Sequence, residues 1–135
     1  MDPASINWLA VLAAAVSMFL LGGVWYSPVL FVHSWMQAAG LREEDLQRAS
    51  SPARIYGGAF VLALIAATNL AFFLGATANL SFGIFAGAAT GIGWVSAAFG
   101  ITYLFERRPL RLLLINGGYF AIAFTIMGAI IGGWR

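Results

Sequence analysis

The side chains best suited to bind a ligand lie beside the arginine-containing connections of this chain. They form two groups, one around Pro28 and one before Pro109: Tyr26, Ser27, His33 and Trp35, and Tyr103, Glu106, Arg107 and Arg108. Their side chains offer hydrogen-bond donors, acceptors and charge. If both groups lie at one face of the molecule, they could line an inward-facing polar pocket. Glu106 should then pair with an arginine of its own turn, and Tyr26 or Ser27 could hydrogen-bond to that ion pair. The alternative is that the aromatic and arginine side chains anchor the chain to lipid headgroups.

Three more polar residues lie in apolar surroundings and complete the candidate ligand-binding set: Asn69, Asn116 and Tyr119. An amide removed from water needs a hydrogen-bond partner. Interhelical hydrogen bonding is the simpler role for both asparagines, and contact with a ligand or ion is the alternative. Four hydroxyl side chains should instead bond to carbonyl groups four residues earlier in their own helices. These are Thr68, Thr90, Ser96 and Thr125.

No residue pattern in this chain is typical of catalysis, metal binding or nucleotide binding. The chain has one histidine and no cysteine, which excludes disulfides, thiolate metal sites and cysteine nucleophiles. We therefore expect no catalytic residue, no metal site and no cofactor. A proton-coupled exporter of the small multidrug-resistance type depends on a membrane-embedded Glu in its first helix. The first helix here offers only Asn7, Ser17 and Tyr26.

The elements that position these side chains follow from three stretches without Asp, Glu, Lys or Arg, at 3–41, 55–105 and 112–134. A helix needs roughly 20 apolar residues to cross ~30 Å of hydrocarbon. The first and last stretches therefore hold one span each, and the middle stretch holds two. Hydrophobic residues make up 61% of the chain and charged residues 9%, against roughly 25% charged residues in soluble proteins. The sequence predicts an all-α integral membrane four-helix bundle.

The predicted spans belong to a single transmembrane domain over residues 1–135, and they cover about 6–27, 53–74, 82–105 and 110–134. Ser5 is the expected N-cap of the first span, and Asp2 and the length of this apolar run favour a retained helix over a cleaved signal peptide.

A polar and amphipathic connection over residues 28–52 should lie in the cytoplasm. Pro28 ends the first span, and residues 28–39 should form a short interfacial helix that ends at Gly40. Residues 41–48 are expected to be helical as well, and Ser51 is the expected cap of the second span.

The distribution of arginine predicts the orientation in the membrane. Six of the seven arginines lie in the first and third connections, and these are Arg42, Arg48, Arg54, Arg107, Arg108 and Arg111. Positively charged connections stay in the cytoplasm. Both termini should therefore face away from the cytoplasm, which an even number of spans permits.

Rows of small residues predict how the spans pack, because lipid-embedded helices associate through close approach of their backbones. The second span has small residues at every fourth position from Ala59 to Gly75, and the third span has Gly83, Gly87 and Gly91. A short turn joins these spans, so we expect the two rows to face each other. Surplus small-residue faces also suggest a homo-oligomer.

The second and fourth spans share the pattern Ile-x-Gly-Gly-x-Phe, at residues 55–60 and 115–120. An internal duplication and chance recurrence in a glycine-rich chain are both open explanations.

Several short runs resemble a bacterial membrane family called domain of unknown function 1761. They are Trp25-Tyr26-Ser27-Pro28, Tyr103-Leu104-Phe105-Glu106, Arg108-Pro109-Leu110, Gly118-Tyr119 and Gly128-Ala129-Ile130. The resemblance covers nearly the whole chain. It implies the same membrane topology, and it implies no chemistry because the family has no assigned activity.

Three classes of function fit these observations. The leading hypothesis is a small inner-membrane protein that acts through homo-oligomeric assembly or partner contact. The second is a channel or facilitator for a small solute, and the third is a membrane-embedded enzyme or binder of a lipophilic molecule. The lipid bilayer is the expected partner in each class, and no nucleic-acid partner is expected.

Overall fold

The computed structural model describes residues 3–42, 44 and 52–134, and within these residues every regular element is a helix. The fold class predicted from the sequence is therefore confirmed. Four helical segments are long and apolar enough to cross a membrane, so the chain is a multi-pass membrane protein. They are α1 (Trp8–Trp25), α4 (Pro52–Leu74), the third span formed by α5 (Leu80–Ala89), η2 (Thr90–Ser96) and α6 (Ala97–Glu106), and α7 (Leu110–Gly133).

Asparagine side chains begin two of these helices. The Oδ1 atom of Asn7 accepts a hydrogen bond from the backbone N–H of Ala10 at 3.2 Å and caps α1. Asn79 caps α5 in the same way through the N–H of Phe82 at 2.8 Å. The expectation that Ser5 caps the first span was wrong, because Ser5 lies in the short helix η1 (Pro3–Ser5) and Asn7 provides the cap.

The interfacial helix α2 (Val32–Ala39) follows the first span but starts later than predicted. Residues 28–31 form turns, and the backbone N–H of Val32 donates to the carbonyl of Ser27 at 3.2 Å. Gly40 ends α2 with a φ of 73°, a left-handed conformation that favours glycine, as predicted. The predicted polar helix over 41–48 and the cap at Ser51 lie mostly or wholly outside the described residues.

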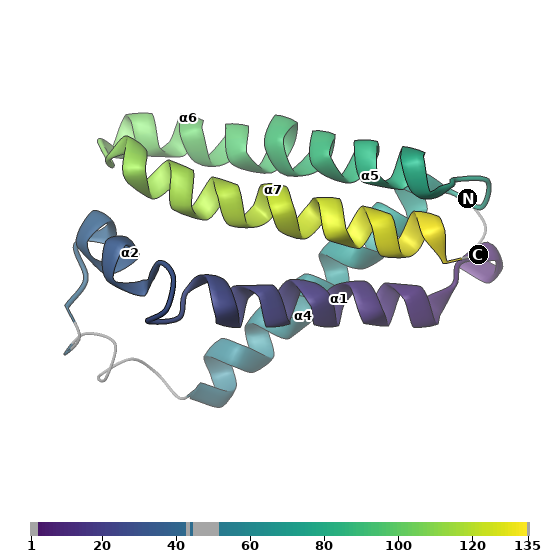
Figure 1. Cartoon of the computed structure of the whole chain (residues 1–135), viewed down its shortest axis with the longest axis horizontal. Coiled ribbons are helices and arrows are strands. Elements are labelled where there is room, and N and C mark those ends of the chain that lie inside the picture. Colours follow the sequence, from purple (N-terminus) through teal and green to yellow (C-terminus); the bar gives the residue numbers. More distant parts are fainter. Residues whose placement is uncertain (1–2, 43, 45–51, 135) are drawn as a thin grey trace.

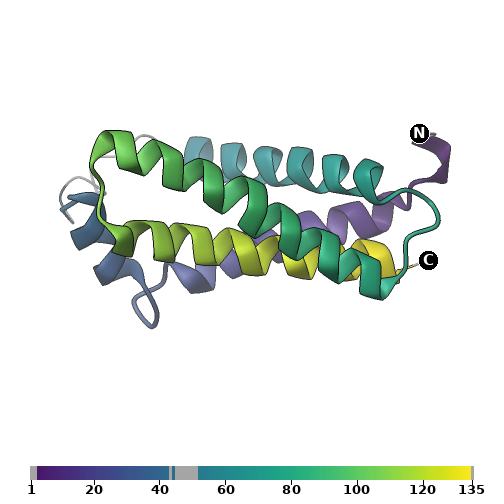
Figure 2. The same ribbon diagram turned by 90° about the horizontal axis from the view of Figure 1, so that it is seen from above.

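Helix α7 lies at the centre of the bundle (Figure 1), with α1 on one side and the third span on the other. Its side chains form much of the core, and Met127 is completely enclosed. Viewed from above, the third span crosses α7 obliquely (Figure 2), so that α5 lies against α7 while α6 diverges from it. At one end of the bundle are α2 and the turn between α6 and α7, which we call the α2 end. We call the opposite end the Asn7 end.

Glycines allow α5 and α7 to touch backbone to backbone. A Cβ atom on Gly83 would overlap the carbonyl oxygen of Gly128, and one on Gly128 would overlap that of Gly83. One turn further along, a Cβ atom on Gly87 would overlap the carbonyl oxygen of Phe124. Such close approach permits dispersion contacts and weak Cα–H···O interactions. The glycine row of the third span therefore faces α7.

The alanine row of α4 packs against α1. Ala63 and Ala67 are buried in one cluster with Ala14 and Ala15 of α1. Towards the α2 end, α4 extends away from the other helices (Figure 1). Its residues 52–59 are all exposed.

The expectation that the small-residue rows of the second and third spans face each other was wrong. Contact between α4 and α5 is slight, whereas α5 packs extensively against α7. The physical reason is that two glycine rows permit closer backbone approach than a glycine row and an alanine row. The alanines of α4 instead match the alanines of α1.

Candidate functional site

The first span ends where the Trp25-Tyr26-Ser27-Pro28 run begins to turn. Proline lacks a backbone N–H, and the residue before it is disfavoured in helical conformation, so α1 does not continue. The hydroxyl group of Ser27 donates to the carbonyl of Val24 at 2.7 Å, and the N–H of Phe31 donates to the carbonyl of Trp25 at 3.1 Å. Residues of the turn therefore satisfy the last carbonyl groups of α1 by hydrogen bonds, and the turn leads the chain into α2.

Trp25 joins α1 to the middle of the bundle. Its indole Nε1 donates a hydrogen bond to the carbonyl oxygen of Ile115 on α7 at 2.9 Å. The ring lies over Gly118, where an added Cβ atom would be 3.3 Å from the indole. Glycine at this position makes room for the indole ring, so the Gly-Gly pair of α7 has a packing role.

Three helices meet in one hydrogen-bonded chain of side chains at the α2 end. The hydroxyl group of Tyr26 donates to Oδ1 of Asn116 at 2.6 Å, and Nδ2 of Asn116 donates to the hydroxyl oxygen of Tyr103 at 2.8 Å. Tyr26 lies at the end of α1, Asn116 lies on α7 and Tyr103 lies on α6. The expected interhelical role of Asn116 is therefore confirmed, and one amide links three spans.

Tyr119 lies one turn further along α7 and is 9% exposed. Its hydroxyl group donates to the carbonyl oxygen of Met18 on α1 at 2.7 Å. A Cβ atom on Gly22 would lie 3.0 Å from this hydroxyl oxygen, so the glycine provides space for the phenol. The rings of Tyr26 and Tyr119 are 5.6 Å apart between centroids, edge to face. Tyr119 thus belongs to the same cluster as Tyr26, Tyr103 and Asn116, which we call the tyrosine cluster.

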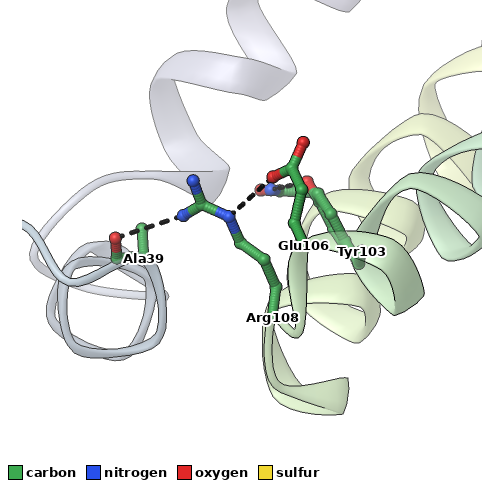
Figure 3. A network of polar contacts seen from close by, with 5 residues as sticks. Ala39, Tyr103, Glu106 and Arg108 are labelled. Carbon is green, nitrogen blue, oxygen red and sulfur yellow. Dashed lines mark hydrogen bonds and ion pairs between the residues drawn. The ribbon is translucent and has the colours of Figure 1, made fainter.

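The charged residues of the turn between α6 and α7 form a separate, exposed group. Arg108 pairs with Glu106 through Nε and Oε1 at 3.0 Å, and Arg108 also donates from a terminal nitrogen to the carbonyl oxygen of Ala39 at 3.4 Å. Figure 3 shows Arg108 lying between Glu106 and the end of α2. The two charged side chains are 41% and 48% exposed, and exposed ion pairs contribute about 0–1 kcal/mol. This contact positions α2 weakly.

The expectation that Tyr26 or Ser27 bonds to this ion pair was wrong. Tyr26 donates to Asn116, and Ser27 donates to Val24 within its own turn. Both hydroxyl groups therefore use their single proton elsewhere.

Arg107 ends α6 in a left-handed conformation with a φ of 60°. Glycine usually occupies such a position, and a residue with a side chain raises the energy by about 1–2 kcal/mol. The N–H of Arg108 compensates in part by donating to the carbonyl of Tyr103 at 2.9 Å. The sequence has no glycine here to mark this sharp turn.

Two predicted site residues lie on α2 with different surroundings. The ring of Trp35 packs edge to face against Tyr26, with centroids 5.6 Å apart. The side chain of His33 is exposed. The structure therefore brings Trp35 to the tyrosine cluster, while His33 faces outward.

Asn69 does not join the other candidates. It lies on the exposed surface of α4, and its Nδ2 donates to the carbonyl oxygen of Ile65 in the same helix at 2.8 Å. The expected interhelical hydrogen bond of Asn69 is thus wrong within one copy of the chain. Thr90 and Thr125 follow the expected pattern, since each bonds to a carbonyl four residues earlier. Thr68 was expected to do the same and does not bond to the carbonyl of Leu64.

The expectation that Ser96 bonds to the carbonyl four residues earlier in its own helix was wrong. Ser96 ends η2, a π-helical segment in the middle of the third span, and its Oγ lies 2.8 Å from the carbonyl oxygen of Gly91. The same Oγ lies 2.9 Å from the carbonyl oxygen of Gly117 on α7. A π-helical turn widens the helix and changes the direction of its side chains. The closely spaced Gly91 and Gly93 are the only feature of the sequence that could have indicated this π-helical segment.

Apart from this cluster, two other observations bear on where a site could lie. Among residues 3–42, 44 and 52–134, no three His, Asp or Glu side chains come together in a group that could hold a metal ion. A small hollow lies at the Asn7 end, remote from the tyrosine cluster. It is lined by Ser5, Ile6, Asn7, Ala71, Gly75 and Ile131.

Comparison with known proteins places this helical bundle in a family. No curated protein and no solved structure matches the chain. A family model with the description "Protein of unknown function (DUF1761)" matches residues 9–132, which include nearly all of the four spans and the whole tyrosine cluster. The resemblance inferred from the Trp-Tyr-Ser-Pro run is confirmed, and this chain belongs to the DUF1761 family of proteins of unknown function.

Proposed function

We propose that this membrane protein acts by assembling with copies of itself, and that it works through contacts between spans. The observation that supports this proposal is the contrast between its interior and its surface. Among the described residues, no buried side-chain nitrogen or oxygen lacks a hydrogen-bond partner. The interior of the described chain therefore holds no buried side-chain donor or acceptor that is left unpaired.

The surface of the bundle presents large exposed apolar faces that a partner helix could cover. Across the most apolar stretch of the third span, 17% of the residues are buried, against 44% in α7. Large apolar side chains such as Phe85, Trp94 and Leu104 are between 69% and 79% exposed. Lipid can cover these faces, but helices of other copies can cover them equally well.

The proposal includes a location and an orientation. We propose that the α2 end faces the cytoplasm, because Arg42, Arg54, Arg107, Arg108 and Arg111 all lie there. Under the positive-inside rule this arrangement is typical of a protein in the cytoplasmic membrane. Both termini then lie on the opposite side.

Counting subunits in lipid tests the proposed assembly. Singly labelled protein in liposomes should show two or more photobleaching steps per particle. The fraction of particles with more than one step should fall as lipid dilutes the protein. An unrelated monomeric membrane protein at the same density provides the control for chance co-occupancy. One bleaching step per particle at every dilution would disprove assembly.

The alternative function is a channel or facilitator for a small solute. In this alternative, Tyr26, Asn116 and Tyr103 would line part of the route from the α2 end. Release of a small dye from the same liposomes, compared with the Asn116→Leu variant, distinguishes a conduit from an assembly protein. A membrane-embedded enzyme or binder of a lipophilic molecule is the third class, and a lipid that copurifies in fixed ratio would favour it.

A further inference from the structure

Asn69 stands out among the amide side chains of the described spans because only its nitrogen has a partner within the chain. Its Nδ2 donates to the carbonyl oxygen of Ile65, and no described residue donates to its Oδ1. By contrast, both ends of the Asn116 amide are bonded to tyrosine hydroxyl groups. Transfer of an amide from water to an apolar medium without a compensating hydrogen bond costs roughly 2–7 kcal/mol.

The position of Asn69 along α4 puts it within the hydrocarbon. The middle of α4 (Pro52–Leu74) is Ala63, and six residues at 1.5 Å each place Asn69 about 9 Å from that middle. The hydrocarbon core extends about 15 Å to each side of the bilayer centre. Neither water nor a lipid headgroup is the natural partner at this depth.

The surroundings of Asn69 form an exposed stripe along α4. We call it the Asn69 stripe, and its residues lie three or four positions apart on the helix: Gly58, Leu62, Ile65, Asn69 and Phe73. Leu62 is 66% exposed and Ile65 is 53% exposed. A 3–4 spacing is the seam by which two helices pack at a small crossing angle.

Gly58 supports the same interpretation. A Cβ atom added to Gly58 would meet nothing within 4 Å. In the equivalent pattern on α7, Gly118 makes room for the ring of Trp25. The glycine on α4 thus leaves space that no part of the described chain uses, on the face that also carries Asn69.

We propose that a second copy of this chain packs against the Asn69 stripe, with the two Asn69 amides hydrogen-bonded to each other across a twofold axis. This inference rests on the proposed homo-oligomeric function and names its surface. A primary amide carries both donors and an acceptor, so two such groups can exchange a pair of N–H···O bonds. The second proton of each Nδ2 is available, since only one is donated to Ile65.

The membrane favours a second copy over an unrelated helix. All copies insert in the same orientation, so a twofold axis along the membrane normal brings identical residues together at the same depth. Asn69 then meets Asn69 without any adjustment of height. A single asparagine in the seam of two parallel helices is also known to select a dimer and its register.

Asn69→Leu tests the hydrogen bonds directly. The substitution keeps the size of the side chain and removes the amide, so the monomer should remain folded while dimerisation in liposomes weakens by about three- to thirtyfold. Thr68→Val is the matched control, because it removes a hydroxyl group from the adjacent position outside the stripe. It should leave dimerisation unchanged.

Cross-linking gives a second test that does not depend on the amide. The chain has no cysteine, so Ile65→Cys introduces a single thiol in the stripe. We expect Ile65→Cys to form a disulfide-linked dimer, since the two positions would lie near the axis. Ile92→Cys is the control, at a similar depth and 60% exposed on the third span, and it should not cross-link.

The outcomes separate this inference from the proposed function. Suppose that the protein assembles but that Asn69→Leu dimerises as the wild type does. If Ile92→Cys then cross-links while Ile65→Cys does not, another face forms the oligomer and the inference is wrong. If wild-type protein is monomeric at all dilutions, both the inference and the proposed assembly are wrong.

Discussion

At the scale of single residues, the two asparagines of the spans show how position decides the role of an amide. Asn116 bonds to Tyr26 and Tyr103, and so connects α7 with α1 and α6. Asn69 has the same chemistry but lies on the exposed surface of α4. The amide of Asn116 stabilises packing within one chain, and under our proposal the amide of Asn69 stabilises a dimer.

We expect Asn116→Leu to lower the free energy of unfolding by about 1–2 kcal/mol. The change leaves the hydroxyl groups of Tyr26 and Tyr103 without their shared partner in a partly buried site. Unfolding in mixed micelles with increasing dodecyl sulfate, followed by circular dichroism, measures the effect. Thr125→Val is the control, because Thr125 bonds only to a carbonyl of its own helix. Equal stability of the two variants would show that the three-helix link contributes nothing.

At the scale of elements, matching of small residues decides which helices touch. Glycines of α5 meet glycines of α7, and alanines of α4 meet alanines of α1. The π-helical segment η2 then lets Ser96 reach Gly117 on α7 as the third span leaves that helix. The Ile-x-Gly-Gly-x-Phe patterns have different surroundings in α4 and α7, so they do not occupy equivalent places in the bundle.

Gly87→Ala should destabilise the fold by at least about 1–3 kcal/mol. The added methyl group would overlap the backbone of α7 at Phe124, and a backbone cannot rotate away as a side chain can. Gly93→Ala is the matched control in the same span, since its Cβ atom would meet nothing within 4 Å. That control should be neutral, or stabilising by up to about 1 kcal/mol through helix propensity. The same unfolding assay applies, and a tolerated Gly87→Ala would mean that α5 and α7 are not in backbone contact.

At the scale of the whole molecule, charge is concentrated at one end of an otherwise apolar bundle. The described arginines lie at the α2 end, and the Asn7 end carries none within the described residues. Under the positive-inside rule, this asymmetry predicts one orientation in the membrane.

A cysteine-free chain makes the orientation simple to measure. Thr77→Cys, in the exposed turn between α4 and α5, should react with a membrane-impermeant maleimide in intact cells. Glu44→Cys, in the connection after α2, should react only after permeabilisation, because positive connections stay in the cytoplasm. A reporter that is active only in the cytoplasm should be inactive when fused after Arg135. The opposite labelling pattern, or an active fusion, would reverse the proposed topology.

The sequence by itself determined the fold class of the protein and its four apolar spans. Hydrophobic length, arginine position and the Gly40 cap are local properties, so they can be read without knowing which helices are neighbours. The candidate residues at the first and third connections could be named for the same reason, and the structure brings Tyr26, Trp35, Tyr103, Asn116 and Tyr119 together. Their proposed role in ligand binding remains a prediction.

Only the tertiary structure decided which of these groups are partners. The small-residue rows of three spans were all visible in the sequence, but each could pair with any other, and the closest backbone approach selected α5 with α7. Tyr26 was expected to bond to the ion pair of Glu106 and bonds instead to Asn116, because α7 and not the α6–α7 turn lies beside it. Asn69 and Asn116 are equivalent as residues in a sequence. They differ because a helix at the centre of a bundle surrounds its amide with partners, whereas a helix at the edge exposes its amide to lipid or to another copy.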